Sequence, residues 1–342
     1  MKKALMALAL ALPGVAMAQQ PAPDFPAHFD SIGSPVEALP GAHNRTIHFT
    51  DTGEADWTPL LYIGGAGTSA RASEMVAFMD TLRRRLHVRI ITVERNGFGD
   101  SAFDPAWGFD DYVDDVRRVL DAKGIGRFAL AAISGGGAYA GHIVAAMPDR
   151  VASWHMLAAV SGMPGDTAMC HLAPDAIAAQ IKGQLAAPRV WWDLPPTGVN
   201  AHVRGFADRA ADEGAHAFFI AGQMGDPRGM AAEYLRFCTP PADVAAYKGP
   251  AYFYYGEADH TVPPLHGERW AAMLKGPVVF RRYPGEGHDT QYRHWDQLLL
   301  DVAGFGGRTL ACVGGKARLL PGVLAPAQLP VKATLGLCAW QA

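Results

Sequence analysis

The sequence predicts an α/β fold in which a mostly parallel sheet is flanked by helices. From about residue 45, short apolar runs alternate with helical patterns, which is typical of strand–helix–strand units. Several of these runs end in glycine-rich turns, as at Gly64-Gly65-Ala66-Gly67. The chain has 342 residues, of which 49% are hydrophobic and 18% charged. This composition excludes a disordered chain, and the length accommodates one large domain or two smaller ones.

The predicted strands are short apolar runs, and the predicted helices are longer periodic segments. The segment 110–122 is expected to be an amphipathic helix, with Val113 and Val116 on the buried face and Asp114, Asp115 and Arg118 outside. Further helices are expected after Gly137 through Ala146 and over 295–305. The strands are expected at 60–63, 88–93, 128–133, 154–160, 251–255 and 278–283.

The regular alternation fails between about 161 and 248, a stretch rich in Ala, Met, Pro and aromatic residues. We interpret 161–248 as a helical insertion, or cap, within a core formed by 19–160 and 249–305. The remaining residues, 306–342, are rich in Gly and Pro and are predicted to form a C-terminal extension.

The first 18 residues resemble a secretory signal peptide. Lys2 and Lys3 precede an apolar run over 4–11, and Ala16-Met17-Ala18 supplies a small-residue cleavage pattern. The run is too short to span a bilayer, which takes about 20 apolar residues. We therefore expect cleavage near Ala18 and a periplasmic or secreted protein without a stable membrane span.

The four cysteines all lie after this segment, and an even number in an oxidising compartment favours two disulfides. Three pairings are possible, and we predict the local pairs Cys170–Cys238 and Cys312–Cys338. No metal site is expected, because the sequence has no C-x-x-C and no H-x-x-x-H spacing. The net charge of −3 gives no basic surface for nucleic acid.

A serine lies at the centre of a strand-to-helix turn, Ala132-Ile133-Ser134-Gly135-Gly136. A nucleophilic serine at such a turn is raised above the sheet, and small residues two before and two after it avoid collisions. The same turn directs the next N–H, that of Gly135, toward the space where an oxyanion forms. The alternatives are a glycine-rich turn with an incidental serine, or a dinucleotide-binding turn. The latter predicts an acidic residue at the end of the next strand, and 154–160 contains none.

A serine nucleophile needs a base, and the base needs a carboxylate that orients it. Asp259 follows the predicted strand 251–255, and His288 follows the strand 278–283. This order along the chain (Ser, acid, His), with each residue just after a strand, is hard to obtain by chance. Glu257 and Asp166 remain alternatives for the acid, because triads are recognised by geometry rather than spacing.

Together these motifs resemble the α/β-hydrolase superfamily over roughly 45–305. The resemblance implies Ser134 as nucleophile, His288 as base and acid, and Asp259 as orienting carboxylate. It also implies an oxyanion hole made by the backbone N–H groups of Gly135 and Ala66. The first loop departs from the usual His-Gly-x-Pro, with Gly64 in place of His and Gly67 in place of Pro. The motifs are Gly64-Gly65-Ala66-Gly67-Thr68-Ser69, Arg95-Asn96-Gly97-Phe98-Gly99-Asp100-Ser101, the Ser134 turn, Gly256-Glu257-Ala258-Asp259 and Gly285-Glu286-Gly287-His288.

The insertion is similar to the helical cap that covers the pocket of many members of this superfamily. Its apolar side chains are candidates for an acyl or alcohol pocket, although most are expected to pack between cap and sheet. Trp107 is a further candidate for the pocket rim. The cap candidates are Trp191, Trp192, Phe206, Phe218, Phe219, Met224, Met230 and Phe237.

The sequence therefore predicts a periplasmic or secreted serine carboxylesterase that acts on a largely apolar small-molecule ester or lactone and needs no cofactor. An amidase or peptidase similar to proline iminopeptidases, or a perhydrolase, is the alternative on the same triad. Two alternatives come from other functional classes. A non-catalytic binding module predicts a broken triad. A nicotinamide oxidoreductase predicts an acidic residue that binds the ribose at the end of the next strand, and this residue is missing here.

Overall fold

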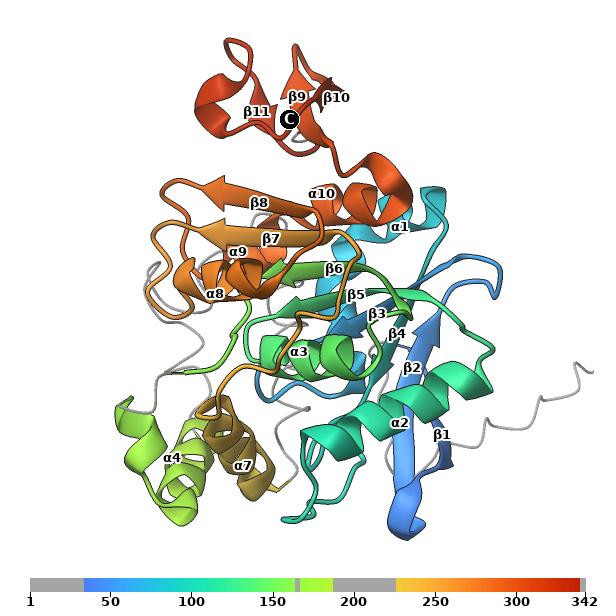
Figure 1. Ribbon diagram of the computed structural model, residues 1–342, viewed down its shortest axis with the longest axis vertical. Helices are drawn as coiled ribbons and strands as arrows, with labels where there is room; N and C mark the ends of the chain where they lie inside the picture. The colour runs from blue at the N-terminus through green and yellow to red at the C-terminus, as the bar shows by residue number, and fades with distance from the viewer. Residues whose placement is uncertain (1–33, 164–166, 187–225, 339–342) are drawn as a thin grey trace, which may run out of the picture. The chain divides into compact units, whose positions relative to one another are not determined.

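The computed structural model describes residues 34–163, 167–186 and 226–338. Within these residues, eight strands form one sheet in the order β1-β2-β4-β3-β5-β6-β7-β8 (Figure 1). Strands β3 to β8 pair in parallel, whereas β2 is antiparallel to both β1 and β4. The mostly parallel sheet is thereby confirmed. The strands are β1 (Glu37–Pro40), β2 (Thr46–Thr52), β3 (Thr58–Ile63), β4 (Val88–Val93), β5 (Phe128–Ile133), β6 (Val151–Leu157), β7 (Ala251–Gly256) and β8 (Val278–Tyr283).

The strand bounds agree with the sequence prediction for β4, β5 and β8, and differ for β6. The predicted strand 154–160 begins earlier, at Val151, and ends at Leu157. The next residue, Ala158, has a φ of +43°, so the chain leaves the extended conformation there. Strands β1 and β2 were not predicted.

Helices cover both faces of the sheet, because alternate residues of each strand point to opposite sides. Leu61 and Ile63 of β3 pack in one cluster with residues of α2, α3 and α8, whereas Leu60 and Tyr62 pack in the other with η2 and α10. The helices of the core are η1 (Ala42–Asn44), η2 (Ala70–Met79), α1 (Asp80–Arg85), α2 (Phe109–Ala122), α3 (Gly136–Ala146), α8 (Leu265–Met273), α9 (Thr290–Arg293), α10 (Trp295–Leu300) and η4 (Asp301–Phe305).

Helix α2 forms as predicted, with Val113 and Val116 buried, but Asp115 was placed on the wrong face. Its side chain is buried, and its Oδ2 accepts a hydrogen bond from Trp107 Nε1 at 3.2 Å. Burial raises the pKa of the Asp115 carboxyl. The indole N–H gives this carboxylate the partner that a buried polar group requires.

The described part of the predicted insertion is helical, with η3 (Ala168–His171), α4 (Pro174–Ala186) and α7 (Pro227–Phe237). Helix α7 begins after Asp226, whose carboxylate accepts the backbone N–H of Arg228. Ile177 and Met230 join the two longer helices in an apolar cluster. The predicted disulfide Cys170–Cys238 is present and links η3 to the end of α7.

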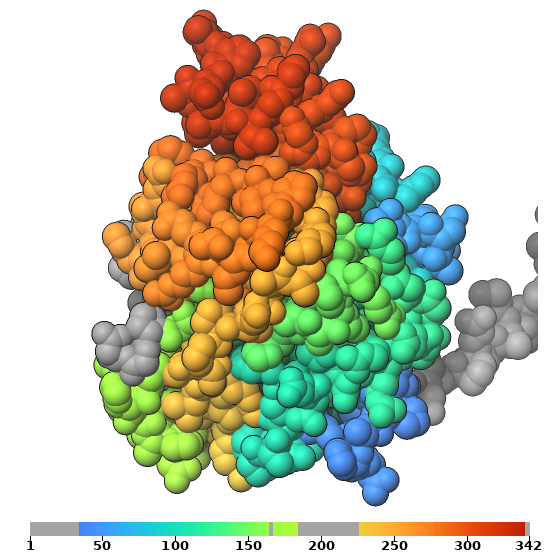
Figure 2. All heavy atoms as spheres, in the orientation of Figure 1, coloured from blue at the N-terminus to red at the C-terminus, as the bar shows by residue number. Residues whose placement is uncertain are grey.

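The C-terminal segment forms a separate three-stranded sheet of β9 (Arg308–Val313), β10 (Lys316–Pro321) and β11 (Thr334–Leu335), with η5 (Pro326–Gln328) between the last two strands. The second predicted disulfide, Cys312–Cys338, is also present. In Figure 2, the red atoms of this segment lie directly on the orange atoms of the preceding elements.

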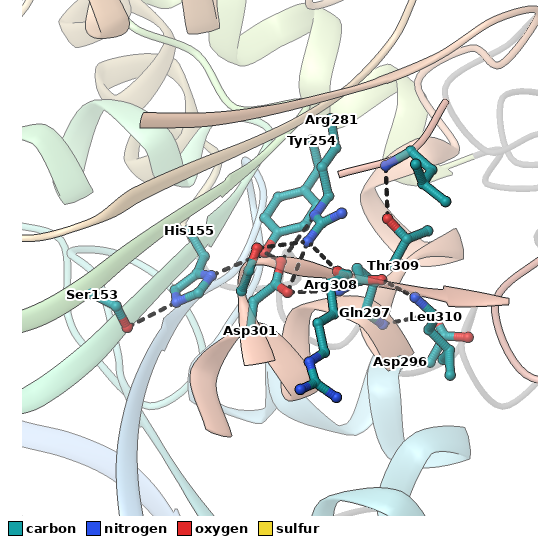
Figure 3. Close-up of polar contacts among 12 residues, drawn as sticks. Ser153, His155, Tyr254, Arg281, Asp296, Gln297, Asp301, Arg308, Thr309 and Leu310 are labelled. Atoms are coloured by element: carbon teal, nitrogen blue, oxygen red, sulfur yellow. Dashed lines mark hydrogen bonds and ion pairs between the residues drawn. The ribbon is translucent and has the colours of Figure 1, made fainter. Parts of the chain in front are cut away.

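Buried polar groups fasten this sheet to the core (Figure 3). Arg281 on β8 pairs with Asp301 at 3.0 Å and donates to the carbonyl of Arg308 at 2.9 Å. The Gln297 side chain accepts the N–H of Leu310 at 2.7 Å. These contacts join backbone groups of β9 to side chains of β8 and α10.

The predicted signal peptide, 1–18, lies outside the described residues. Among the residues that the structure does describe, none of the helices combines the length and apolar character needed to cross a membrane.

Candidate active site

Ser134, Asp259 and His288 meet at the carboxyl edge of the sheet, although they are far apart in the chain. His288 Nε2 lies 3.0 Å from Ser134 Oγ, and His288 Nδ1 lies 2.8 Å from Asp259 Oδ2. The three residues follow β5, β7 and β8 respectively. Parallel strands bring their carboxyl ends to the same edge, where ligands of open α/β sheets bind. The side chains of Asp259 and His288 are almost completely buried.

Ser134 has the strained backbone that the sequence predicts for this turn. Its φ is +46°, in the left-handed region that non-glycine residues rarely adopt. Its carbonyl accepts the N–H groups of Gly137 at 3.1 Å and Val160 at 2.8 Å, and these bonds hold the turn. A Cβ on Gly136 would lie 2.5 Å from the carbonyl oxygen of Gly64, so only glycine fits there.

The carboxylate of Asp259 is held from both sides. Its Oδ1 accepts the backbone N–H groups of Thr261 and Val262, each at 2.8 Å, while Oδ2 faces the His288 ring. Glu257, one of the alternatives, is exposed in the same loop. Asp166, the other, lies outside the described residues.

The loop after β3 brings Ala66 next to the serine turn. A Cβ placed on Gly135 would lie 3.0 Å from the Ala66 nitrogen, and one on Gly65 would lie 3.3 Å from Ser134 Cβ. The predicted oxyanion donors, Ala66 and Gly135, therefore lie side by side. At Gly64 a Cβ would lie 2.2 Å from Thr68 Oγ1, which explains why this chain has glycine where the superfamily usually has His.

Arg95 was noted in the sequence only as part of a motif, with no role assigned to it, and Glu233 was not singled out. Arg95 and Glu233 form a buried ion pair behind the loop after β3, with Arg95 Nε 2.6 Å from Glu233 Oε1. The available signal was the pair of charged residues Glu94 and Arg95 immediately after the fully buried strand β4, because a buried charge requires a partner. Nothing in the sequence around Glu233 identifies it as that partner.

A buried histidine lies near the triad. The ring of His266 accepts the backbone N–H of Ser161 through Nδ1 at 3.1 Å. Burial, with Arg269 as a second cause, lowers the pKa of His266 to about 4. His266 is therefore neutral at physiological pH and serves as a hydrogen-bond acceptor.

The pocket candidates are only partly described. Trp191, Trp192, Phe206, Phe218, Phe219 and Met224 lie outside the described residues. Trp107 is buried against Tyr112, with the guanidinium of Arg45 5.3 Å from its ring, and it lines a surface cavity with Asp111. Phe237 lies at the site itself: a Cβ on Gly135 would be 2.6 Å from its Cζ.

In the part of the chain that the structure describes, no group of three or more His, Cys, Asp or Glu side chains is arranged to hold a metal ion. The arrangement of Ser134, His288 and Asp259 is suited to nucleophilic attack by a serine hydroxyl, with proton transfer through the imidazole.

Comparison with known proteins assigns this chain to a family. Residues 60–302 match the model described as "Alpha/beta hydrolase family". The putative carbamate hydrolase RutD of Variovorax paradoxus is 27% identical over 264 residues, which cover 75% of this chain and 95% of that protein. A putative aryl esterase from Burkholderia cenocepacia has a TM-score of 0.62 at 18% identity, covering 80% of this chain and 98% of that one. An esterase from Exiguobacterium antarcticum has a TM-score of 0.61 at 13% identity, covering 80% and 99%. This chain belongs to the alpha/beta hydrolase family.

Proposed function

We propose that the protein is a serine hydrolase that cleaves carboxylic esters through an acyl-enzyme on Ser134. The observation that carries this proposal is the hydrogen-bonded chain from Ser134 Oγ through His288 to Asp259, with links of 3.0 and 2.8 Å. A serine hydroxyl is a weak nucleophile until a neighbouring base accepts its proton. The strained turn at Ser134 and the membership of the alpha/beta hydrolase family are consistent with this role.

The proposed reaction has two steps, acylation of Ser134 and hydrolysis of the acyl-enzyme. Ser134 Oγ attacks the ester carbonyl while His288 Nε2 takes its proton, and the carbonyl oxygen becomes an oxyanion that accepts the N–H groups of Ala66 and Gly135. His288 then donates the proton to the departing alcohol oxygen as its bond to carbon breaks. Water attacks the acyl-enzyme, His288 accepts the water proton, and the same ring returns it to Ser134 as the acid leaves.

The substrate we propose is a largely apolar small-molecule ester or lactone. Phe237 lies beside Gly135, so one wall next to the proposed oxyanion hole is aromatic. The cap candidates Trp191, Trp192, Phe218, Phe219 and Met224 would extend this apolar wall.

We further propose that the protein works outside the cytoplasm, after cleavage of residues 1–18. The two disulfides, Cys170–Cys238 and Cys312–Cys338, are compatible with an oxidising compartment. Mass spectrometry of the protein purified from the periplasm or culture medium tests this directly. An N-terminus near Gln19 supports export, and a full-length chain that remains in the cytoplasm contradicts it.

A fluorophosphonate probe and a panel of chromogenic substrates test the proposed activity. We expect the probe to add its mass at Ser134, no labelling of Ser134→Ala, and hydrolysis of p-nitrophenyl esters by the wild type only. Matched p-nitroanilides and carbamates are run beside the esters. Folded wild-type protein without label, or a preference for anilides or carbamates over esters, overturns the esterase assignment.

A further inference from the structure

Arg95 and Glu233 form an ion pair that is buried directly behind the loop carrying Ala66. Arg95 follows β4, whereas Glu233 lies on α7 of the insertion. Arg95 Nε is 2.6 Å from Glu233 Oε1, and the two side chains are 2% and 1% exposed. Because both charges are removed from water, each depends on the other and on the remaining hydrogen bonds.

The remaining guanidinium nitrogens of Arg95 hold two carbonyls of the loop. Nη1 donates to Gly64 at 3.1 Å, and Nη2 donates to Gly65 at 2.7 Å. The Thr68 hydroxyl also donates to the Gly65 carbonyl, at 2.8 Å. In a trans peptide the N–H points opposite to the preceding carbonyl. Fixing the Gly65 carbonyl on Arg95 therefore turns the N–H of Ala66 away from Arg95, toward the side where Gly135 lies.

Glu233 holds the other side of the same loop. Its second oxygen, Oε2, accepts the N–H of Gly67 at 2.9 Å. Gly67 has a φ of +76°, so the loop adopts a conformation that its own sequence does not enforce. A proline, which is usual at this position in the superfamily pattern, holds φ at about −65° and has no N–H, so it could neither adopt this conformation nor bond to Glu233. Here the ion pair supplies the restraint that the sequence of the loop lacks.

The same pair ties the loop to the position of α7. Gly229 of α7 packs on Gly97, where a Cβ on Gly97 would lie 2.8 Å from the Gly229 Cα. The backbone of α7 therefore contacts the backbone of the segment that follows β4. This contact brings Glu233 within hydrogen-bonding distance of Arg95. If α7 moves away, the carboxylate leaves both Arg95 and the N–H of Gly67.

We infer that Arg95 and Glu233 are positioning residues that preorganise the Ala66 oxyanion donor, so that turnover requires α7 to be docked. This inference rests on the proposed serine hydrolase function. The hydrogen bonds of the pair run between its two members and to Gly64, Gly65 and Gly67, so the pair acts through the direction of the Ala66 N–H. Because that donor is used when the oxyanion forms, breaking the pair lowers kcat and leaves KM nearly unchanged.

The test compares Glu233→Gln with Asp301→Asn, which breaks the pair of Asp301 and Arg281 on the far side of the core. That control pair is similarly buried, with side chains 0% and 4% exposed. For Glu233→Gln we expect kcat on a p-nitrophenyl ester to fall about 100-fold, the size of losing one oxyanion donor. For Asp301→Asn we expect a lower Tm and an unchanged kcat per folded molecule.

A trifluoromethyl ketone supplies a second measurement. Ser134 Oγ adds to its carbonyl, His288 takes the serine proton, and the resulting alkoxide occupies the oxyanion hole. Its inhibition constant should therefore rise in parallel with the loss of kcat in Glu233→Gln. The double variant R95M/E233M removes both buried charges, so it folds without an unpaired charge and should also have a low kcat. A folded variant of either kind with kcat and ketone affinity within twofold of the wild type overturns the inference.

These experiments distinguish a failure of this inference from a failure of the proposed function. If Ser134→Ala hydrolyses the ester as fast as the wild type, the serine hydrolase proposal itself fails. If Ser134→Ala is inactive while folded Glu233→Gln retains the wild-type kcat, the proposed function stands and the positioning role of the pair is wrong.

Discussion

The tip of the Phe237 ring occupies the place that a side chain on Gly135 would need. A Cβ on Gly135 would lie 2.6 Å from Phe237 Cζ and 3.0 Å from the Ala66 nitrogen. Side-chain contacts of Cβ atoms are normally longer than about 3.4 Å, close to the optimum for carbon atoms. The last turn of α7 and the serine turn are therefore fitted to each other at the point where the oxyanion is proposed to form.

Gly135→Ala should lower kcat at least about tenfold, because its methyl group must displace Phe237 and crowd the Ala66 amide. Adding Phe237→Ala should restore little activity, since the backbone of Ala66 remains in the way. Gly126→Ala is the matched control, because a Cβ at Gly126 meets nothing within 4 Å. Steady-state kinetics on one p-nitrophenyl ester measure all three variants, and a wild-type kcat for Gly135→Ala contradicts this packing argument.

Asp259→Asn should reduce kcat by about four orders of magnitude while leaving the protein folded, because an amide no longer holds His288 in the tautomer that accepts the serine proton. Glu257→Gln changes an exposed carboxylate in the same loop and should keep the wild-type rate. Equal losses in the two variants, or a loss in Glu257→Gln alone, would show that Asp259 is not the orienting acid.

Glu94 should make stability depend on pH in the direction opposite to most carboxylates. Its side chain is 4% exposed, and burial raises its pKa to about 7 from 4.5. Between these two values the folded state binds the extra proton, so the Glu94 contribution to stability falls as the pH rises. The free energy of unfolding of Glu94→Gln, relative to that of the wild type, should therefore rise by up to about 3 kcal/mol between pH 4 and pH 8.

Urea unfolding of both proteins at a series of pH values measures this difference. Any constant effect of the amide cancels, because only the change with pH is compared. Glu54→Gln, at an exposed position, serves as the control. If the stability difference for Glu94→Gln is the same at pH 4 and pH 8, burial does not hold a proton on Glu94.

The two disulfides should differ in their effect on activity. Each closes a loop, with sequence separations of 68 for Cys170–Cys238 and 26 for Cys312–Cys338, so replacing either pair by serine should cost about 3–4 kcal/mol of stability. Cys238 caps α7, the helix that carries Glu233. Loss of the first bridge should therefore also reduce kcat several-fold at a temperature where both variants are folded. A lower kcat for the Cys312–Cys338 variant alone would contradict the coupling of α7 to the site.

The sequence predicted β3 to β8 well, but it predicted neither β1 and β2 nor the strands of the small C-terminal sheet. The bounds of β4, β5 and β8 follow directly from apolar runs that end in turns. Strand β1 consists mainly of exposed residues and pairs antiparallel with β2, so it leaves no apolar pattern. In the small sheet only the middle of β9 is buried, while β10 and β11 have no buried residue, so a disulfide and buried polar contacts hold it instead.

Local patterns, together with the resemblance to the superfamily, predicted Ser134, Asp259 and His288, and the structure brings their side chains within hydrogen-bonding distance. Each follows a strand whose end is encoded nearby, and parallel strands end at one edge of the sheet. The partnership of Arg95 with Glu233 was decided only by the fold. These residues are 138 positions apart, and their meeting depends on how α7 packs against the chain after β4. The direction that we infer for the Ala66 N–H depends on this long-range packing, and no pattern within a single segment contains that information.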